Sequence, residues 1–160
     1  MAFKFTEENS RRIEETVKKY PHKNAAVMPV LYIAQEQDGW ISQDVIREVA
    51  AVLEMTAEEV LGIVTFYSMY HTKPAGKYHL QVCTNVSCML RGATDIYKHV
   101  KGKLKIENEG VTDDNLFSLE EVECMGSCGT APMIAVNNDY FENLSVQKVD
   151  EIIESLKNKN

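Results

Sequence analysis

Two stretches, each with a pair of cysteines, decide how this sequence folds: residues 82–92 read VCTNVSCMLRG, and residues 122–132 read VECMGSCGTAP. Four residues lie between Cys83 and Cys88 in the first stretch, and three lie between the cysteines of the second. Both pairs begin at or just after the end of a predicted strand. Two strands that end side by side would bring the four sulfurs to one point, so the pattern predicts a sheet that carries them at one edge.

A turn at residues 73–76, Lys-Pro-Ala-Gly, precedes the strand that leads to the first pair. After it, Tyr78, Leu80 and Val82 alternate with polar residues, which is typical of a half-buried strand. A second strand is predicted over residues 116–122, and it leads to the second pair in the same way.

The rest of this half alternates helices and short strands. The predicted elements are a helix from Cys88 to Val100, a polar loop or weak strand over 102–115, strands Met133–Val136 and Tyr140-Phe141 joined by a turn at 137–139, and a last helix capped by Ser145. The order β, α, β, ββ, α predicts a small sheet with helices packed on it.

Residues 1–70 have a helical pattern instead. Starts and stops for four helices occur at Thr6 and Pro21, at Pro29 and Gly39, at Ser42, and at Thr56 with Glu59. The third helix has the clearest apolar stripe, formed by Val45, Ile46, Val49 and Leu53. We therefore predict an α+β protein with a helical domain at residues 1–74 and an α/β domain at residues 75–160.

Composition excludes several classes of protein. With 44% hydrophobic and 26% charged residues, the chain reads as an ordinary globular protein. Its net charge of −7 argues against nucleic-acid binding, since phosphate contacts need a basic face. No apolar run approaches the roughly 20 residues that span a bilayer, and residues 1–19 lack the apolar core of a signal peptide. We expect a cytoplasmic protein, where four cysteines favour metal or redox chemistry over disulfides.

The spacing of the cysteines leaves several sites open. Structural zinc is possible, although neither pair has the common Cys-x2-Cys spacing. That absence also argues against a thioredoxin-type redox pair. A plant-type ferredoxin would need a cysteine three positions after Cys88, where Arg91 stands. Inert buried thiols would not need to gather in two loop-borne pairs. Spacing alone favours a metal centre without choosing the metal.

The two cysteine stretches closely resemble the thioredoxin-like [2Fe-2S] subunit of respiratory complex I, the proton-pumping NADH:quinone oxidoreductase. The resemblance continues through residues 65–70, Thr-Phe-Tyr-Ser-Met-Tyr, and back to residues 38–40, Asp-Gly-Trp. It implies a thioredoxin-like domain that carries one [2Fe-2S] cluster, preceded by a helical domain. By motif match, the cluster ligands are Cys83, Cys88, Cys124 and Cys128.

The resemblance also implies a partner, a flavoprotein subunit that binds FMN and NADH, and a place on the cytoplasmic face of the inner membrane through that complex. The chain would act as one subunit of an oxidoreductase, because it has neither a Gly-x-Gly-x-x-Gly fingerprint nor a Walker A loop with which to bind a nucleotide itself. Its own share would be single-electron transfer. Related subunits serve NAD-linked or bifurcating hydrogenases and formate dehydrogenases, so these assemblies remain alternatives, beside a zinc-binding interaction module and a free-standing ferredoxin.

A few other residues could suggest a site. The four histidines, at positions 22, 71, 79 and 99, are scattered, and we assign them to packing or surface. Trp40 is expected to anchor the core. The aromatic cluster of Phe66, Tyr67, Met69 and Tyr70 lies near the domain junction. We expect it to pack between the halves, with a docking surface for the flavoprotein as the alternative.

Overall fold

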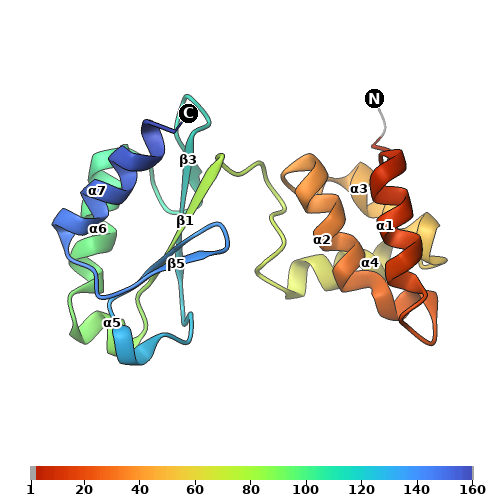
Figure 1. Ribbon diagram of the computed structural model, residues 1–160, viewed down its shortest axis with the longest axis horizontal. Coiled ribbons are helices and arrows are strands. Elements are labelled where there is room, and N and C mark those ends of the chain that lie inside the picture. The colour runs from red at the N-terminus through yellow and green to blue at the C-terminus, as the bar shows by residue number, and fades with distance from the viewer. Residues whose placement is uncertain (1–2, 160) are drawn as a thin grey trace. The chain divides into compact units, whose positions relative to one another are not determined.

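The structure is a computed structural model that describes residues 3–159. The chain divides into two compact units, Met1–Pro74 and Ala75–Asn160. Figure 1 shows the helices and strands of both units. Each unit has its own buried hydrophobic core.

The first unit is entirely helical over the part of it that the structure describes. Its elements are α1 (Glu7–Val17), a 3-10 turn η1 (Lys23–Ala26), α2 (Val27–Asp38), α3 (Gln43–Leu53) and α4 (Ala57–Phe66). Their boundaries follow from local chemistry. The hydroxyls of Thr6 and Ser42 accept hydrogen bonds from backbone N–H groups in the first turns of α1 and α3. Thr56 and Glu59 form the predicted capping box of α4, and Gly39, with φ of 82°, ends α2.

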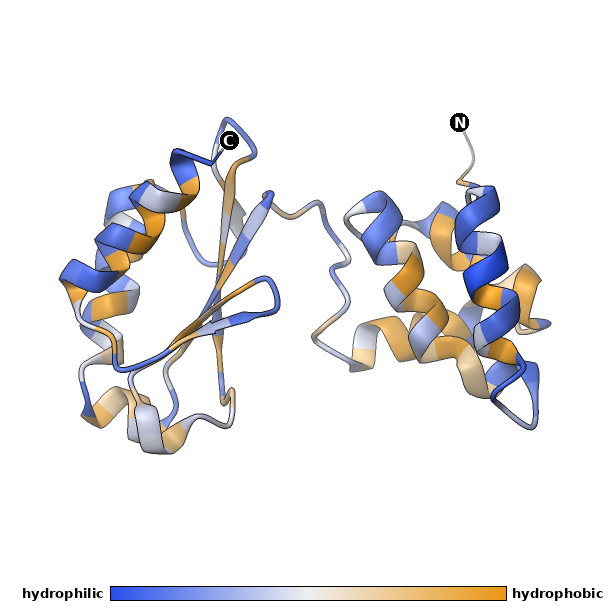
Figure 2. Cartoon of the chain, viewed as in Figure 1, coloured by the Kyte–Doolittle hydropathy of each residue, from blue (hydrophilic) through white to orange (hydrophobic). Residues whose placement is uncertain are grey.

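The core of this unit lies between the helices. The predicted stripe of α3 is fully confirmed, because all four of its apolar side chains are buried. Figure 2 shows that α4 differs, since it is apolar over most of its length. Only Val60 and Val64 of α4 are buried, whereas Leu61 and Phe66 stay exposed.

The second unit is a five-stranded sheet with helices. Its elements are β1 (Tyr78–Cys83), α5 (Val86–Leu90), α6 (Ala93–Leu104), β2 (Gly110–Val111), β3 (Phe117–Val122), a 3-10 turn η2 (Cys128–Thr130), β4 (Ile134–Val136), β5 (Asp139–Phe141) and α7 (Val146–Lys157). The strand order is β2-β3-β1-β4-β5. Only the central pair, β1 with β3, is parallel, and the other pairs are antiparallel.

Alternation along β1 sorts its side chains between the two faces of the sheet. Leu80 and Val82 belong to the core that α6 and α7 close over one face (Figure 1). On these two helices the apolar residues gather on the side toward the sheet (Figure 2). His79 and Cys83 have the opposite parity, so β1 brings a cysteine to its end on the face away from these helices.

Several expectations about local structure are wrong. The helix predicted from Cys88 to Val100 is two helices, because Gly92 with φ of 93° breaks it, and Cys88 lies inside the first of them. The first helix ends at Val17, before Pro21. Trp40 is only half-buried and lies outside the buried core, since it follows the turn that ends α2.

Candidate metal centre

The two cysteine stretches leave the sheet from neighbouring strands. β1 and β3 run parallel, with Cys83 opposite Val122, and the N–H of Thr84 donates to the carbonyl of Val122 over 3.1 Å. The thiol of Cys83 lies 3.6 Å from the carbonyl oxygen of Glu123. The expected arrangement of two strands that end side by side is therefore present, and it sets the first cysteine against the segment that leads to Cys124.

Cys83 and Cys88 form the buried half of the group, at 3% and 2% exposure. Ala93, Ala131 and Met133 pack around them in a small apolar cluster. Burial raises the pKa of the Cys88 thiol to about 11, and a hydrogen bond with Cys83 acts in the same direction. The raised pKa means that the protonated thiol is favoured over the thiolate. A metal cation would reverse this preference because it binds the thiolate and displaces the proton.

Cys124 and Cys128 form the exposed half. They lie in the loop from β3 to β4, where Gly126 takes a left-handed conformation with φ of 81°. The charge of Cys128 also contributes to the raised pKa of Cys88. The four thiols therefore divide into a buried pair and an exposed pair.

The thiols do not close around a single point. Among residues 3–159, no group of three or more His, Cys, Asp or Glu side chains is arranged to hold one metal ion. A [2Fe-2S] cluster makes a different demand, because its four thiolates are divided between two irons. One pair on a rigid strand and helix, and a second pair on a loop of the neighbouring strand, fit that division. The donor set also fits, since thiolates are the soft ligands that iron–sulfur clusters use.

Polar side chains tie the two cysteine stretches together. The guanidinium of Arg91 donates to the carbonyl of Ala131 over 3.2 Å. The hydroxyl of Thr84 donates to the carboxylate of Glu121 over 2.8 Å. Sequence reasoning did not identify these residues as part of the site, because each contact joins positions about 40 residues apart and no local pattern announces it.

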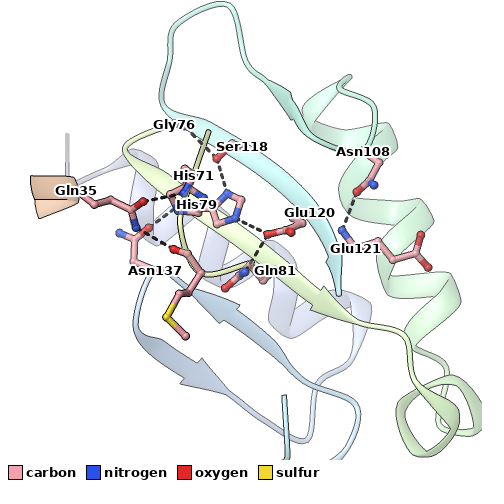
Figure 3. Close-up of polar contacts among 11 residues, drawn as sticks. Gln35, His71, Gly76, His79, Gln81, Asn108, Ser118, Glu120, Glu121 and Asn137 are labelled. Atoms are coloured by element: carbon pink, nitrogen blue, oxygen red, sulfur yellow. Dashed lines mark hydrogen bonds and ion pairs between the residues drawn. The ribbon is translucent and has the colours of Figure 1, made fainter. Parts of the chain in front are cut away.

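His79, which we assigned to packing or surface, forms hydrogen bonds that join two strands. Its ring nitrogens lie 2.8 Å from the hydroxyl of Ser118 and 2.9 Å from a carboxylate oxygen of Glu120, and Gln81 donates to the same carboxylate (Figure 3). The network crosses from β1 to β3 on the face of the sheet that also carries Cys83. It fastens together the two strands that deliver the cysteines.

A match to a protein-family model accounts for both the architecture and the cysteine pairs. The model of the thioredoxin-like [2Fe-2S] ferredoxins matches residues 13–157. The chain belongs to this family. A thioredoxin-like [2Fe-2S] ferredoxin carries its cluster for electron transfer, and the protein determines where the cluster sits and at what potential it works.

Curated relatives match the ferredoxin along nearly its whole length. An NADH-quinone oxidoreductase subunit from Rickettsia bellii is 45% identical over 98% of this chain and 95% of its own length. The corresponding subunit of the same oxidoreductase from Rhizobium meliloti is 43% identical over 96% of this chain and 57% of its own length. These relatives are subunits of an oxidoreductase.

Among solved structures, the ferredoxin resembles the air-oxidised NAD+-reducing [NiFe]-hydrogenase, with a TM-score of 0.71 and 17% sequence identity. The match covers 81% of this chain and 23% of the hydrogenase chain. It supports the α+β fold. Within residues 3–159 of the ferredoxin, no helix has the length and apolar character needed to cross a membrane.

Proposed function

We propose that this chain is the electron-transfer subunit of an NADH:quinone oxidoreductase and that Cys83, Cys88, Cys124 and Cys128 hold its [2Fe-2S] cluster. One observation carries the proposal: two cysteine pairs leave neighbouring parallel strands in a chain that is 45% identical to a subunit of an oxidoreductase with that name. When bound, the cluster accepts and returns one electron at a time.

The two cysteine pairs would hold the cluster in different ways. The buried pair, Cys83 and Cys88, is fixed by the strand β1, the helix α5 and an apolar backing. The exposed pair, Cys124 and Cys128, lies on a loop and would give a redox partner access to the site. Two thiolates that are held rigidly and two that are carried on a loop allow the site to assemble around the cluster and remain accessible to electrons.

The proposed partner is a flavoprotein subunit that binds FMN and NADH. In the described residues of this chain we find no dinucleotide fingerprint, so hydride chemistry belongs on another subunit and only single electrons need to pass to this one. In that assembly the chain would be peripheral, on the cytoplasmic face of the inner membrane. The oxidoreductase name of the relatives supports both proposals.

The helical unit is proposed as the docking domain for this partner. The end of α4 and the segment after it expose Phe66 at 78%, Tyr67 at 37% and Met69 at 39%. Tyr70 in the same cluster is buried, and its hydroxyl donates to the carbonyl of Met28 over 2.9 Å. The cluster therefore has one residue that secures it to the first unit and three that are available to a partner, as aromatic-rich interfaces require.

Metal analysis of anaerobically purified protein tests the ligand set. We expect about two iron and two sulfide per chain together with visible charge-transfer absorption. Stoichiometric zinc without sulfide, in a colourless protein, would instead identify a zinc-binding interaction module.

Affinity purification from the native cell tests the assembly. Recovery with an FMN-binding subunit and quinone-reducing partners supports the oxidoreductase. Recovery with a hydrogenase or a formate dehydrogenase would move the chain to one of the alternative complexes. Recovery without any stable partner would indicate a free-standing ferredoxin.

A further inference from the structure

The loop that carries the exposed cysteines is weakly defined by packing. Cys124, Cys128 and both glycines of the loop, Gly126 and Gly129, are exposed. A Cβ atom added at either glycine would meet no other atom within 4 Å. The apolar contacts that position Cys83 and Cys88 therefore have no counterpart around Cys128, and another kind of interaction must set the direction of its thiol.

The β4–β5 hairpin supplies polar contacts to this loop. The hydroxyl of Tyr140 donates to the carbonyl of Met125 over 3.2 Å. Just after β5, the carboxylate of Glu142 accepts a hydrogen bond from the hydroxyl of Thr130 over 2.6 Å, and the N–H of Asn143 donates to the carbonyl of Thr130 over 2.7 Å.

The pKa of Glu142 also responds to its neighbours. A hydrogen bond from Ser127, followed by the one from Thr130, lowers the pKa of the Glu142 carboxyl below its ordinary value, so the group is ionised at neutral pH. An ionised carboxylate only accepts hydrogen bonds, and both hydroxyls can donate to it. The Thr130 hydroxyl has a second acceptor in reach, the carbonyl of Ser127 at 3.3 Å, but its single hydrogen favours the shorter contact to Glu142.

Ser127 and Thr130 stand on either side of one cysteine. Ser127 immediately precedes Cys128, and Thr130 closes the 3-10 turn that begins at Cys128. The Glu142 carboxylate and the N–H of Asn143 both hold Thr130 at one end of this segment. The N–H of Thr130 in turn donates to the carbonyl of Ser127 at the other end over 3.2 Å. Hydrogen bonds to charged groups are the strong ones, so Glu142 restrains the backbone that carries Cys128.

We infer that Glu142 is a positioning residue for the second half of the cluster site: its carboxylate holds Thr130, at the end of the turn that begins at Cys128, and so presents Cys128 to iron. This inference rests on the proposed role of Cys128 as a ligand. Glu142 acts on Cys128 through Thr130.

The rate at which the cluster is released tests whether Glu142 positions Cys128. The full-length protein, purified with its cluster, is incubated anaerobically with excess EDTA while the visible absorption is followed. Glu142→Gln keeps the size of the side chain and removes the charge that makes the hydrogen bond to Thr130 strong. We expect absorption to decay about tenfold faster than in the parent, as for loss of a hydrogen bond to a charged group, with broadened EPR signals. Glu151→Gln, which removes an exposed carboxylate on α7, is the matched control and should decay at the parent rate.

A double-mutant cycle separates the positioning role of Glu142 from a general effect of charge or stability. Ser127→Ala with Thr130→Val should accelerate decay by the same factor, and adding Glu142→Gln should accelerate it no further. The inference is overturned if Glu142→Gln decays at the parent rate, or if its effect multiplies with that of the double variant. It is also overturned if Glu142→Gln slows decay, because the carboxylate would then act only by repelling the cluster.

Hydrogen exchange keeps this test independent of the proposed function. A parent protein without iron and sulfide would overturn the cluster assignment itself. The backbone amides of residues 125–130 should still exchange faster in Glu142→Gln than in the parent, with α7 unchanged. Equal exchange in the loop would contradict the positioning role of Glu142 in either case.

Discussion

The four cysteines differ in their surroundings, and this difference gives their substitutions different outcomes. Replacement of any one of Cys83, Cys88, Cys124 and Cys128 with Ala should abolish or severely destabilise the cluster, because each iron loses a thiolate. Cys→Ser should be more selective. The exposed positions can hydrate a hydroxyl that fails to ligate, whereas the buried positions cannot do so without cost. Ser at position 124 or 128 should therefore retain more perturbed cluster than Ser at 83 or 88.

Visible absorption and EPR spectra of the eight variants check this expectation. A Cys→Ala variant with both spectra unchanged would remove that cysteine from the ligand set. Binding of the cluster should also increase the order of both cysteine stretches, because metal binding is coupled to folding. Removal of the cluster should therefore speed hydrogen exchange at residues 83–92 and 122–132 and leave the helices of the first unit unaffected.

Glu123 should lower the reduction potential through its charge. The cluster gains a negative charge on reduction, so a nearby carboxylate opposes the electron. The backbone of Glu123 lies against Cys83, and its side chain is exposed. A unit charge about 8 Å away would shift the potential by roughly 90 mV at an effective dielectric of ~20, and screening by water and salt reduces this to about 10–50 mV. Glu123→Gln should raise the potential by that amount.

A spectroelectrochemical titration measures the shift. Glu123→Lys should roughly double it, because the change in charge is twice as large, and added salt should shrink both shifts. Glu151→Gln on α7 again serves as the control, with an unchanged potential. A lower potential in both Glu123 variants would show that hydrogen bonding or solvent access, and not local charge, controls the cluster.

At the scale of secondary-structure elements, the parallel contact between β1 and β3 depends on a glycine. A Cβ added at Gly76 would lie 2.4 Å from the carbonyl carbon of Phe117, where only backbone could yield. The N–H of Gly76 also donates to the hydroxyl of Ser118 over 3.0 Å. Gly76→Ala should separate the start of β1 from β3 and destabilise the protein by ~1–3 kcal/mol.

Gly102 is the matched control for Gly76. It lies inside α6 with nothing within 4 Å of the added methyl group, so Gly102→Ala should stabilise the protein by ~0.5–1 kcal/mol. Urea unfolding of both variants gives the two signs. Equal stability of Gly76→Ala and the parent would mean that the backbone at Phe117 moves without cost.

Elements with a local cause could be predicted from the sequence. Thr6, Ser42 and Ser145 each cap the helix assigned to them, and β1 ends at Cys83 as its alternation indicates. The break between α5 and α6 could not be predicted, because Gly92 adopts its left-handed conformation in the middle of a pattern that suits a single helix. The hairpin turn is shorter than expected, since Asp139 pairs with Val136.

The candidate site could be predicted only in part, because some of its contacts have no local cause in the sequence. The thiols are visible as pairs in the sequence, and strand ends indicate that the pairs converge. Side chains that support them, such as Arg91, Tyr140 and Glu142, come from other elements and contact backbone or hydroxyl groups in the loop. Such contacts follow from the sheet order β1-β4-β5, which no local pattern in the sequence determines.

At the scale of the whole molecule, the two units have different proposed tasks. The unit Ala75–Asn160 contains all four cysteines, and the unit Met1–Pro74 has none. Each has a buried core of its own, so each can be altered with little effect on the core of the other. Separate cores allow electron transfer and assembly to be tested separately.

The helical unit should supply most of the affinity for the flavoprotein. Deletion of residues 1–74 should leave a coloured protein that retains its cluster and no longer assembles.

The sharper test is Phe66→Ser in the full chain, which removes the most exposed aromatic side chain of that unit, at 78% exposure. Since aromatic residues dominate interface energies, we expect affinity to fall about tenfold or more. Tyr20→Ser, at 38% exposure in the same unit, is the control with affinity unchanged. Reconstitution with the purified flavoprotein, followed by calorimetry, measures all three. Full affinity in the deleted protein would place the docking surface on the cluster-bearing unit, whereas equal losses for Phe66→Ser and Tyr20→Ser would point to a broad surface without a dominant anchor.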